Sequence, residues 1–103
     1  MTQDTMTAKQ RVAKLFAGEA VDKVPCFSGM GNVTTEGLKN LGHKFAAIHL
    51  DAEMMAEAAA TSYQLLGIEC GVVPFDVCVE AAAMGCEINV YAHSEDLRYP
   101  TIK

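Results

Sequence analysis

The stretch from Ile68 to Tyr91 constrains the fold of this chain more than any other. An apolar, β-branched run, Ile68 to Val73, leads into a Pro-Phe-Asp loop, and an alanine-rich segment then extends to Gly85 before a second apolar run, Cys86 to Tyr91. Short apolar runs bounded by Pro and Gly are typical of buried strands. The pattern predicts a strand, a loop, a helix that begins at Val77 and a second strand. Such alternation favours an α/β fold with parallel pairing through right-handed crossovers.

Asp76 follows directly after the first of these predicted strands. In parallel α/β sheets, ligands bind beyond the carboxyl ends of the strands, so Asp76 is the candidate catalytic residue and Phe75 a candidate binding residue. The alternative is a helix cap, in which the carboxylate accepts from the N–H group of Val79 or a neighbour. Glu80 lies one helical turn below Asp76 and is either the second member of a carboxylate pair or an ordinary solvated side chain.

Composition limits the classes of partner. The chain has 103 residues, 50% of them hydrophobic, and eight Lys and Arg against 13 Asp and Glu give a net charge of -5. This charge argues against nucleic acid or an anionic membrane as a partner. No apolar run approaches the roughly 20 residues that span a bilayer, and the N-terminus lacks the layout of a signal peptide. We therefore expect one soluble, cytoplasmic domain at most.

Cysteine and histidine spacings match no common zinc signature. The cysteines form no CxxC pair and lie among apolar residues, so we expect four small buried side chains and no disulfide. The alternative is a metal site drawn from His49, Cys70, Cys78 or Cys86. No metal ligand is assigned to this chain. The residues considered are His43, His49, His93, Cys26, Cys70, Cys78 and Cys86.

Glycines and a proline punctuate the first half of the chain. Val24 to Phe27 is predicted to be extended, and the turn that follows contains the candidate binding residues Gly29, Met30, Gly31 and Asn32. This turn matches neither the dinucleotide fingerprint nor the P-loop, because the second half of each pattern is missing. It is either a sharp strand-to-helix connection or a loop that lines a ligand cleft.

Capping patterns define the helices. In all, we predict about three short strands and four helices, and the ambiguous segment His43 to Leu50 is assigned to a loop. The helices are about Ala8 to Ala17, Thr35 to Leu41, Ala52 to Leu66 and the segment after Asp76, and the strands are Val24 to Phe27, Ile68 to Val73 and Cys86 to Tyr91.

Three segments together resemble the N-terminal part of the uroporphyrinogen decarboxylase superfamily. They are KQRVAKLFAGEAVDKVPCF, GMGNVTTEGLKNLGHKF with HLDAEMMAEAA, and VPFDVCVEAAAMGCEIN. The first two are more similar to its corrinoid-dependent branch, the methylcobalamin:coenzyme M methyltransferases. The resemblance implies the N-terminal portion of a (β/α)8 (TIM) barrel, incomplete as a single chain. Residues 1–18 would be a leading helix, residues 19–91 the first two βα units and residues 92–103 a loop or truncated tail.

The resemblance also implies roles for particular residues. Asp76 matches an aspartate that contacts the pyrrole nitrogens of the substrate in the decarboxylases, where a carboxylate can stabilise positive charge on the ring. The arginine-containing loop of the decarboxylases has no counterpart, because the segment SGMGNVTTE lacks a basic residue. The zinc ligands of the methyltransferases, a His-x-Cys pair and a later Cys, are not matched within these 103 residues.

The resemblance therefore implies methyl transfer from a methylcobalamin corrinoid to a thiol or similar acceptor, provided that another chain completes the barrel. The alternatives are a tetrapyrrole decarboxylase and a non-catalytic oligomeric or corrinoid-binding module. The complete enzyme would need zinc and a corrinoid, whereas the isolated chain is expected to contain no cofactor and to be inactive. Two barrel strands leave parallel edges and an apolar face uncovered, so we expect a homo-oligomer or a second chain, with a corrinoid protein as a further partner.

Overall fold

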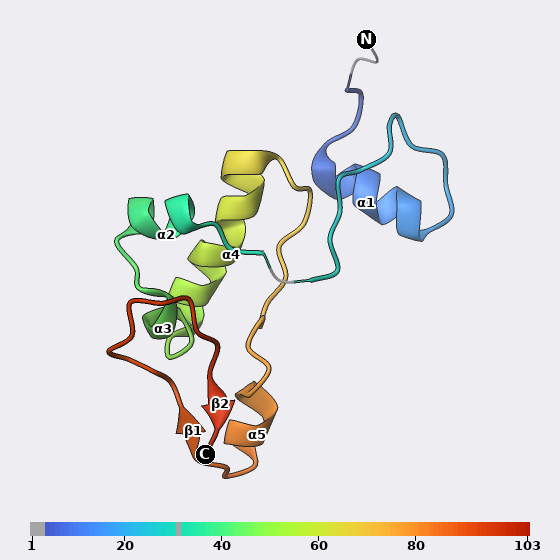
Figure 1. The fold of residues 1–103 in the computed structure, drawn as a ribbon. Helices are drawn as coiled ribbons and strands as arrows, with labels where there is room; N and C mark the ends of the chain where they lie inside the picture. Colours follow the sequence, from blue (N-terminus) through green and yellow to red (C-terminus); the bar gives the residue numbers. More distant parts are fainter. Residues whose placement is uncertain (1–3, 31) are drawn as a thin grey trace.

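The computed structural model describes residues 4–30 and 32–103. The chain is elongated, with principal dimensions of 49 × 30 × 18 Å. Its N-terminal helix stands apart from a group of helices, and a helix with two short strands lies near the C-terminus (Figure 1). The described elements are α1 (Ala8–Phe16), α2 (Thr35–Leu41), α3 (Phe45–Ile48), α4 (Ala52–Leu66), α5 (Val79–Ala83), β1 (Ile88–Asn89) and β2 (Thr101–Ile102).

Polar caps and glycines set the ends of the longer helices. Thr7 and Gln10 form a capping box at the start of α1. Asp51 caps α4 by accepting a 2.9 Å hydrogen bond from the N–H group of Met54. Gly67 then ends α4 in the left-handed conformation, with φ 71°, which glycine adopts without steric cost. Consequently α2 and α4 have the predicted bounds, and α1 ends one residue before its predicted end.

The segment His43 to Leu50, assigned to a loop from the sequence, contains a fifth helix, α3. Phe45, Ala46 and Ile48 on this single turn are buried, and the turn packs against α4. Its N-cap residue, Lys44, makes no side-chain capping bond. Tertiary packing therefore stabilises α3 where local sequence signals are weak.

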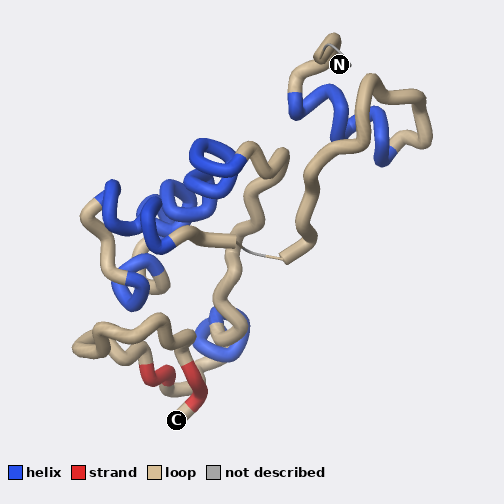
Figure 2. The backbone as a smooth tube through the Cα atoms, turned by 45° about the horizontal axis from the view of Figure 1, so that its top comes forward, coloured by secondary structure: helices blue, strands red, loops and turns tan. Residues whose placement is uncertain are grey.

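The first two predicted strands are not strands in the described residues. Val24 to Phe27 and Ile68 to Val73, here called the two extended segments, are drawn as loop in Figure 2, and the second bends at Glu69 and Val73. They lie side by side, and the Glu69 N–H group donates to the Cys26 carbonyl oxygen at 2.7 Å. The returning bond uses a side chain, because the Cys26 N–H group donates to Oε2 of Glu69 at 3.1 Å. A side chain thus takes the place of a backbone ladder between these segments.

The observed sheet also corrects the third predicted strand and the tail. Only Ile88 and Asn89 of the predicted run Cys86 to Tyr91 form a strand, β1. This strand pairs antiparallel with β2, with Ile88 opposite Ile102. The tail, predicted to be a loop, reverses direction and supplies β2. The described residues therefore contain five helices and two strands, with antiparallel rather than parallel pairing.

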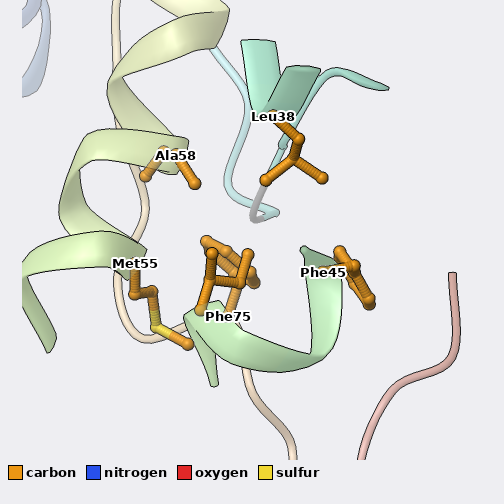
Figure 3. Close-up of a cluster of buried hydrophobic side chains, with 7 residues drawn as sticks. Leu38, Phe45, Met55, Ala58 and Phe75 are labelled. Carbon is orange, nitrogen blue, oxygen red and sulfur yellow. The ribbon is translucent and has the colours of Figure 1, made fainter. Parts of the chain in front are cut away.

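The hydrophobic core lies among α2, α3 and α4, and Phe75 inserts into it from the loop after residue 73. In Figure 3 the labelled side chains from the three helices surround Phe75. Burying an aromatic side chain stabilises a fold by several kcal/mol relative to truncating it, on the order of 3–5. Phe75 therefore fixes the position of the residue that follows it. The core consists of Leu38, Phe45, Ile48, Met55, Ala58, Ala59 and Phe75.

Gly37 sets how closely α2 approaches α4. A Cβ atom at this position would overlap the side chains of Thr61 and Thr34. The Thr34 hydroxyl caps α2 by accepting from the Gly37 N–H group at 2.9 Å. The same hydroxyl lies 3.3 Å from that of Thr61 on α4. Glycine is therefore required here by packing, and not by a special backbone conformation.

Candidate functional site

Asp76 occupies a turn between the core and α5. Its Oδ1 atom accepts a 2.7 Å hydrogen bond from the N–H group of Cys78, and the side chain is half-buried. Helix α5 begins at Val79, two residues after the predicted start, so Asp76 stabilises a turn before the helix. Within the part of the chain that the structure describes, its second carboxylate oxygen receives no hydrogen bond. That oxygen can accept from a ligand.

The two neighbours of Asp76 that the sequence singles out differ in environment. Phe75 is buried in the core. Glu80 is exposed in the first turn of α5, and no hydrogen bond joins it to Asp76 among residues 4–30 and 32–103. The structure thus places Phe75 as the anchor of the turn and leaves the carboxylate pair a prediction.

The predicted binding turn is held by its own polar groups. The hydroxyl of Ser28 accepts from the Met30 N–H group and donates to the Met30 carbonyl, both at 3.2 Å. The amide of Asn32 donates to the same carbonyl at 3.1 Å. The Met30 side chain is 77% exposed, and Gly29 is exposed as well. Gly31 lies outside the described residues.

A buried ion-pair network, which the sequence reasoning missed, connects α1 to both extended segments. Arg11 is 2% exposed and binds Asp22 through Nε at 2.6 Å and through a second nitrogen at 2.9 Å. It also pairs with Glu69. A single acidic residue in an apolar run, Glu69, indicated a buried ion pair. Its partner could not be identified from the sequence, because Arg11 lies 58 positions away.

The network shifts the pKa values of Arg11 and Asp22. The hydrogen bond from Arg11 holds the pKa of Asp22 well below its usual range, against an opposing effect of burial. The same bond raises the pKa of Arg11 above its ordinary value. Both side chains therefore stay charged at neutral pH, and together they fix α1 relative to residues 22 and 69.

His49 is a second feature that spacing did not reveal. Its Nδ1 atom lies 2.8 Å from the Phe45 carbonyl oxygen, which can only accept, so Nδ1 carries the proton. The Nε2 atom is buried and has no partner in the described residues. The ring packs edge-on against Phe45, Phe75 and Tyr99, with centroids 4.7, 5.8 and 5.8 Å away. His49 therefore belongs to an aromatic cluster beneath the Asp76 turn.

The cysteines are free thiols, as predicted, but only one of them is buried. Cys78 is buried and donates to the Pro100 carbonyl at 3.2 Å, while Cys70 is half-buried. Cys26 and Cys86 are exposed, which corrects the prediction of four buried side chains. No three His, Cys, Asp or Glu side chains in residues 4–30 and 32–103 come together as a metal-ligand set. These residues therefore do not fit the zinc that the family resemblance implies.

An apolar cavity of about 790 Å³ separates α1 from α4. Residues of both helices line it, together with residues of the segment after α4. Among residues 4–30 and 32–103, the structure contains no helix with the length and hydrophobicity of a membrane span. The lining residues are Thr7, Ala8, Lys9, Val12, Ala13, Ala56, Ala59, Ala60, Tyr63, Glu69, Cys70, Gly71 and Val73.

The family of the chain follows from its match over nearly the whole length. Residues 7–101 match the model of the uroporphyrinogen decarboxylase (URO-D) family. The chain therefore belongs to this family, and the resemblance inferred from its three sequence segments is confirmed.

Within this family, the chain is similar to coenzyme M methyltransferases. The chain is 31% identical over 107 residues to a methylated-thiol–coenzyme M methyltransferase of Methanosarcina mazei, covering 92% of this chain and 29% of the relative. It is 36% identical over 84 residues to the methylcobamide:CoM methyltransferase MtaA of Methanosarcina barkeri, covering 82% and 25%.

A solved structure agrees with these sequence matches. A methyltransferase from Methanosarcina mazei has a TM-score of 0.80 and 33% identity, covering 95% of this chain and 28% of that one. The chain therefore has the fold of the matching part of that methyltransferase. It spans between a quarter and a third of the length of the relatives described above.

Proposed function

We propose that this chain supplies the N-terminal, substrate-facing part of a corrinoid-dependent methyltransferase with a (β/α)8 barrel. The observation that carries the proposal is the Asp76 turn. It follows the second extended segment, is anchored by Phe75 in the core, and keeps one carboxylate oxygen available. In a (β/α)8 barrel, residues just beyond a strand's C-terminal end face the active site. The similarity to methyltransferases at a TM-score of 0.80 supports this placement.

In this proposal the methyl donor is a corrinoid and the acceptor a thiol such as coenzyme M. Corrinoids carry primary amide groups around the ring, which donate hydrogen bonds. The free oxygen of Asp76 would accept from such a donor and orient the ring, while Met30 on the 28–30 turn would contact its apolar surface. The residues that activate the thiol would come from outside these 103 residues.

Exposed apolar side chains support completion by another polypeptide or a further copy. Val24, Val77 and Met84 are 88, 80 and 85% exposed, and the cavity beside α1 is lined mainly by apolar groups. An uncovered apolar cavity is a surface to which another polypeptide can bind. The absence of a basic residue from SGMGNVTTE makes a tetrapyrrole carrying acidic side chains the weaker candidate substrate. A corrinoid-binding module without activity of its own is the remaining alternative.

A complementation assay tests the proposal. The Methanosarcina mazei methylated-thiol–coenzyme M methyltransferase, shortened by the N-terminal part that matches this chain, is mixed with the chain, zinc, methylcobalamin and coenzyme M. We expect thiol methylation only when both polypeptides are present. Asp76→Asn should reduce the rate by about tenfold to a hundredfold, the effect of losing a hydrogen bond to a charged group. Glu80→Gln should have the smaller effect. A wild-type mixture without activity contradicts the proposal.

A further inference from the structure

Two adjacent side chains, Glu69 and Cys70, bind the backbone of the segment opposite. Glu69 accepts from the Cys26 N–H group at 3.1 Å. The Cys70 sulfur accepts from the Ser28 N–H group at 3.2 Å and donates to the Ser28 carbonyl oxygen at 3.0 Å. Both polar groups of the Ser28 backbone are therefore satisfied by one thiol, at the point where the segment enters the 28–30 turn.

We propose that Cys70 is a positioning residue, which holds the 28–30 turn in place for ligand binding. The Ser28 hydroxyl contacts both the N–H group and the carbonyl oxygen of Met30, so fixing Ser28 also restrains Met30. On the other side, the buried Ser62 of α4 donates to the Asn32 carbonyl oxygen at 2.9 Å. The turn is thus attached to the 68–73 segment by Cys70 before it and to α4 by Ser62 after it. The link to ligand binding rests on the function proposed above.

The chemistry of these contacts requires a group that both donates and accepts. A thiol bearing its proton does both, and so does a hydroxyl, whereas a methyl group does neither. Cys70→Ser should therefore retain the attachment, and Cys70→Ala should release it. Cys86→Ala is the matched control, because Cys86 is exposed and its thiol makes no hydrogen bond within the described residues.

Amide hydrogen exchange of the full chain, measured by NMR, tests the attachment without any ligand. In Cys70→Ala the exchange rate of the Ser28 amide should rise by about fivefold or more, which corresponds to losing one hydrogen bond of ordinary net strength. Exchange in the middle of α4 should stay unchanged. Cys70→Ser and Cys86→Ala should resemble the wild type. An unchanged Ser28 rate in Cys70→Ala overturns the proposal, and so does an equal rise at Ser28 and in α4 that Cys70→Ser fails to reverse.

The complementation assay separates this inference from the proposed function. With Cys70→Ala, the KM for methylcobalamin should rise by about fivefold while kcat stays near the wild-type value, because the turn contributes to binding. A lower kcat with an unchanged KM would indicate loss of folded protein and contradict the positioning role. If no mixture transfers methyl groups, the proposed function fails, while the exchange experiment still decides whether Cys70 holds the turn.

Discussion

At the scale of single residues, the buried Arg11–Asp22–Glu69 network fixes the N-terminal helix. Removing one partner of a buried ion pair strongly lowers the stability of the fold, because an uncompensated charge is left in the interior. The network also replaces a backbone ladder, since Glu69 uses its second oxygen to bind the Cys26 N–H group. Arg11 therefore links α1 to both extended segments through one acidic side chain.

Because of this network, the stability of the fold should fall at low pH. Because the folded-state pKa of Asp22 lies below its unfolded value, its stabilisation is complete above the unfolded value of about 3.9 and is lost as the pH falls toward the folded-state value. Thermal unfolding followed from pH 7 to pH 2 should show this loss. Asp22→Asn should be less stable at pH 7 and should have a flatter acid profile. Glu36→Gln, an exposed control, should keep the wild-type profile.

Gly37 gives a second prediction at this scale. Gly37→Ala places a methyl group against Thr61 and should destabilise the fold by about 1–3 kcal/mol, the usual cost of overpacking. Gly29→Ala is the control, because a Cβ atom there meets nothing within 4 Å. Urea unfolding measures both variants. Equal stability of the two would show that α2 can move away from α4 without cost.

At the scale of elements, α2, α3, α4 and the loop that carries Phe75 form one unit. The bounds of α2 and α4 could be predicted from Thr34, Gly42, Asp51 and Gly67, because caps act within a few residues. Helix α3 could not, because its burial comes from contacts with α4. The two extended segments also misled the prediction, since strands depend on distant partners and these partners bind through the side chains of Glu69 and Cys70.

The same limit applies to the candidate site. The position of Asp76 after an apolar run was sufficient to single it out, and its hydrogen bond to the Cys78 N–H group is a local turn contact. The surroundings of Phe75 were not predictable, because His49 and Tyr99 come from other parts of the chain. The position of Asp76 could therefore be predicted from neighbouring residues, whereas the aromatic side chains that pack around Phe75 could not.

Phe75 should contribute strongly to the stability of this unit. Phe75→Ala should lower the free energy of unfolding by about 3–5 kcal/mol through the lost burial and the cavity it leaves. The Asp76 turn should then lose its fixed position, visible as faster exchange of the Cys78 amide, which Asp76 accepts from. Val77→Ala is the control because Val77 is 80% exposed. A stability loss as small as that of the control would place the anchor of the turn elsewhere.

At the scale of the whole molecule, α1 stands apart from the other helices (Figure 1), and an apolar cavity lies between it and α4. The chain spans 28% of the solved methyltransferase that it resembles. Under the proposed function, the remainder of a barrel would cover this cavity and exposed side chains such as Val24 and Met84. The proposed function therefore depends on a partner that covers these apolar surfaces.

Light scattering after size exclusion measures whether these apolar surfaces bind another polypeptide. At micromolar concentration, the chain alone should self-associate, because its apolar surface is uncovered. Mixed with the shortened Methanosarcina mazei relative, it should form a 1:1 complex, and Val24→Asp should weaken that complex while Glu36→Gln leaves it intact. A stable, dispersed monomer that elutes unchanged beside the shortened relative would contradict the account.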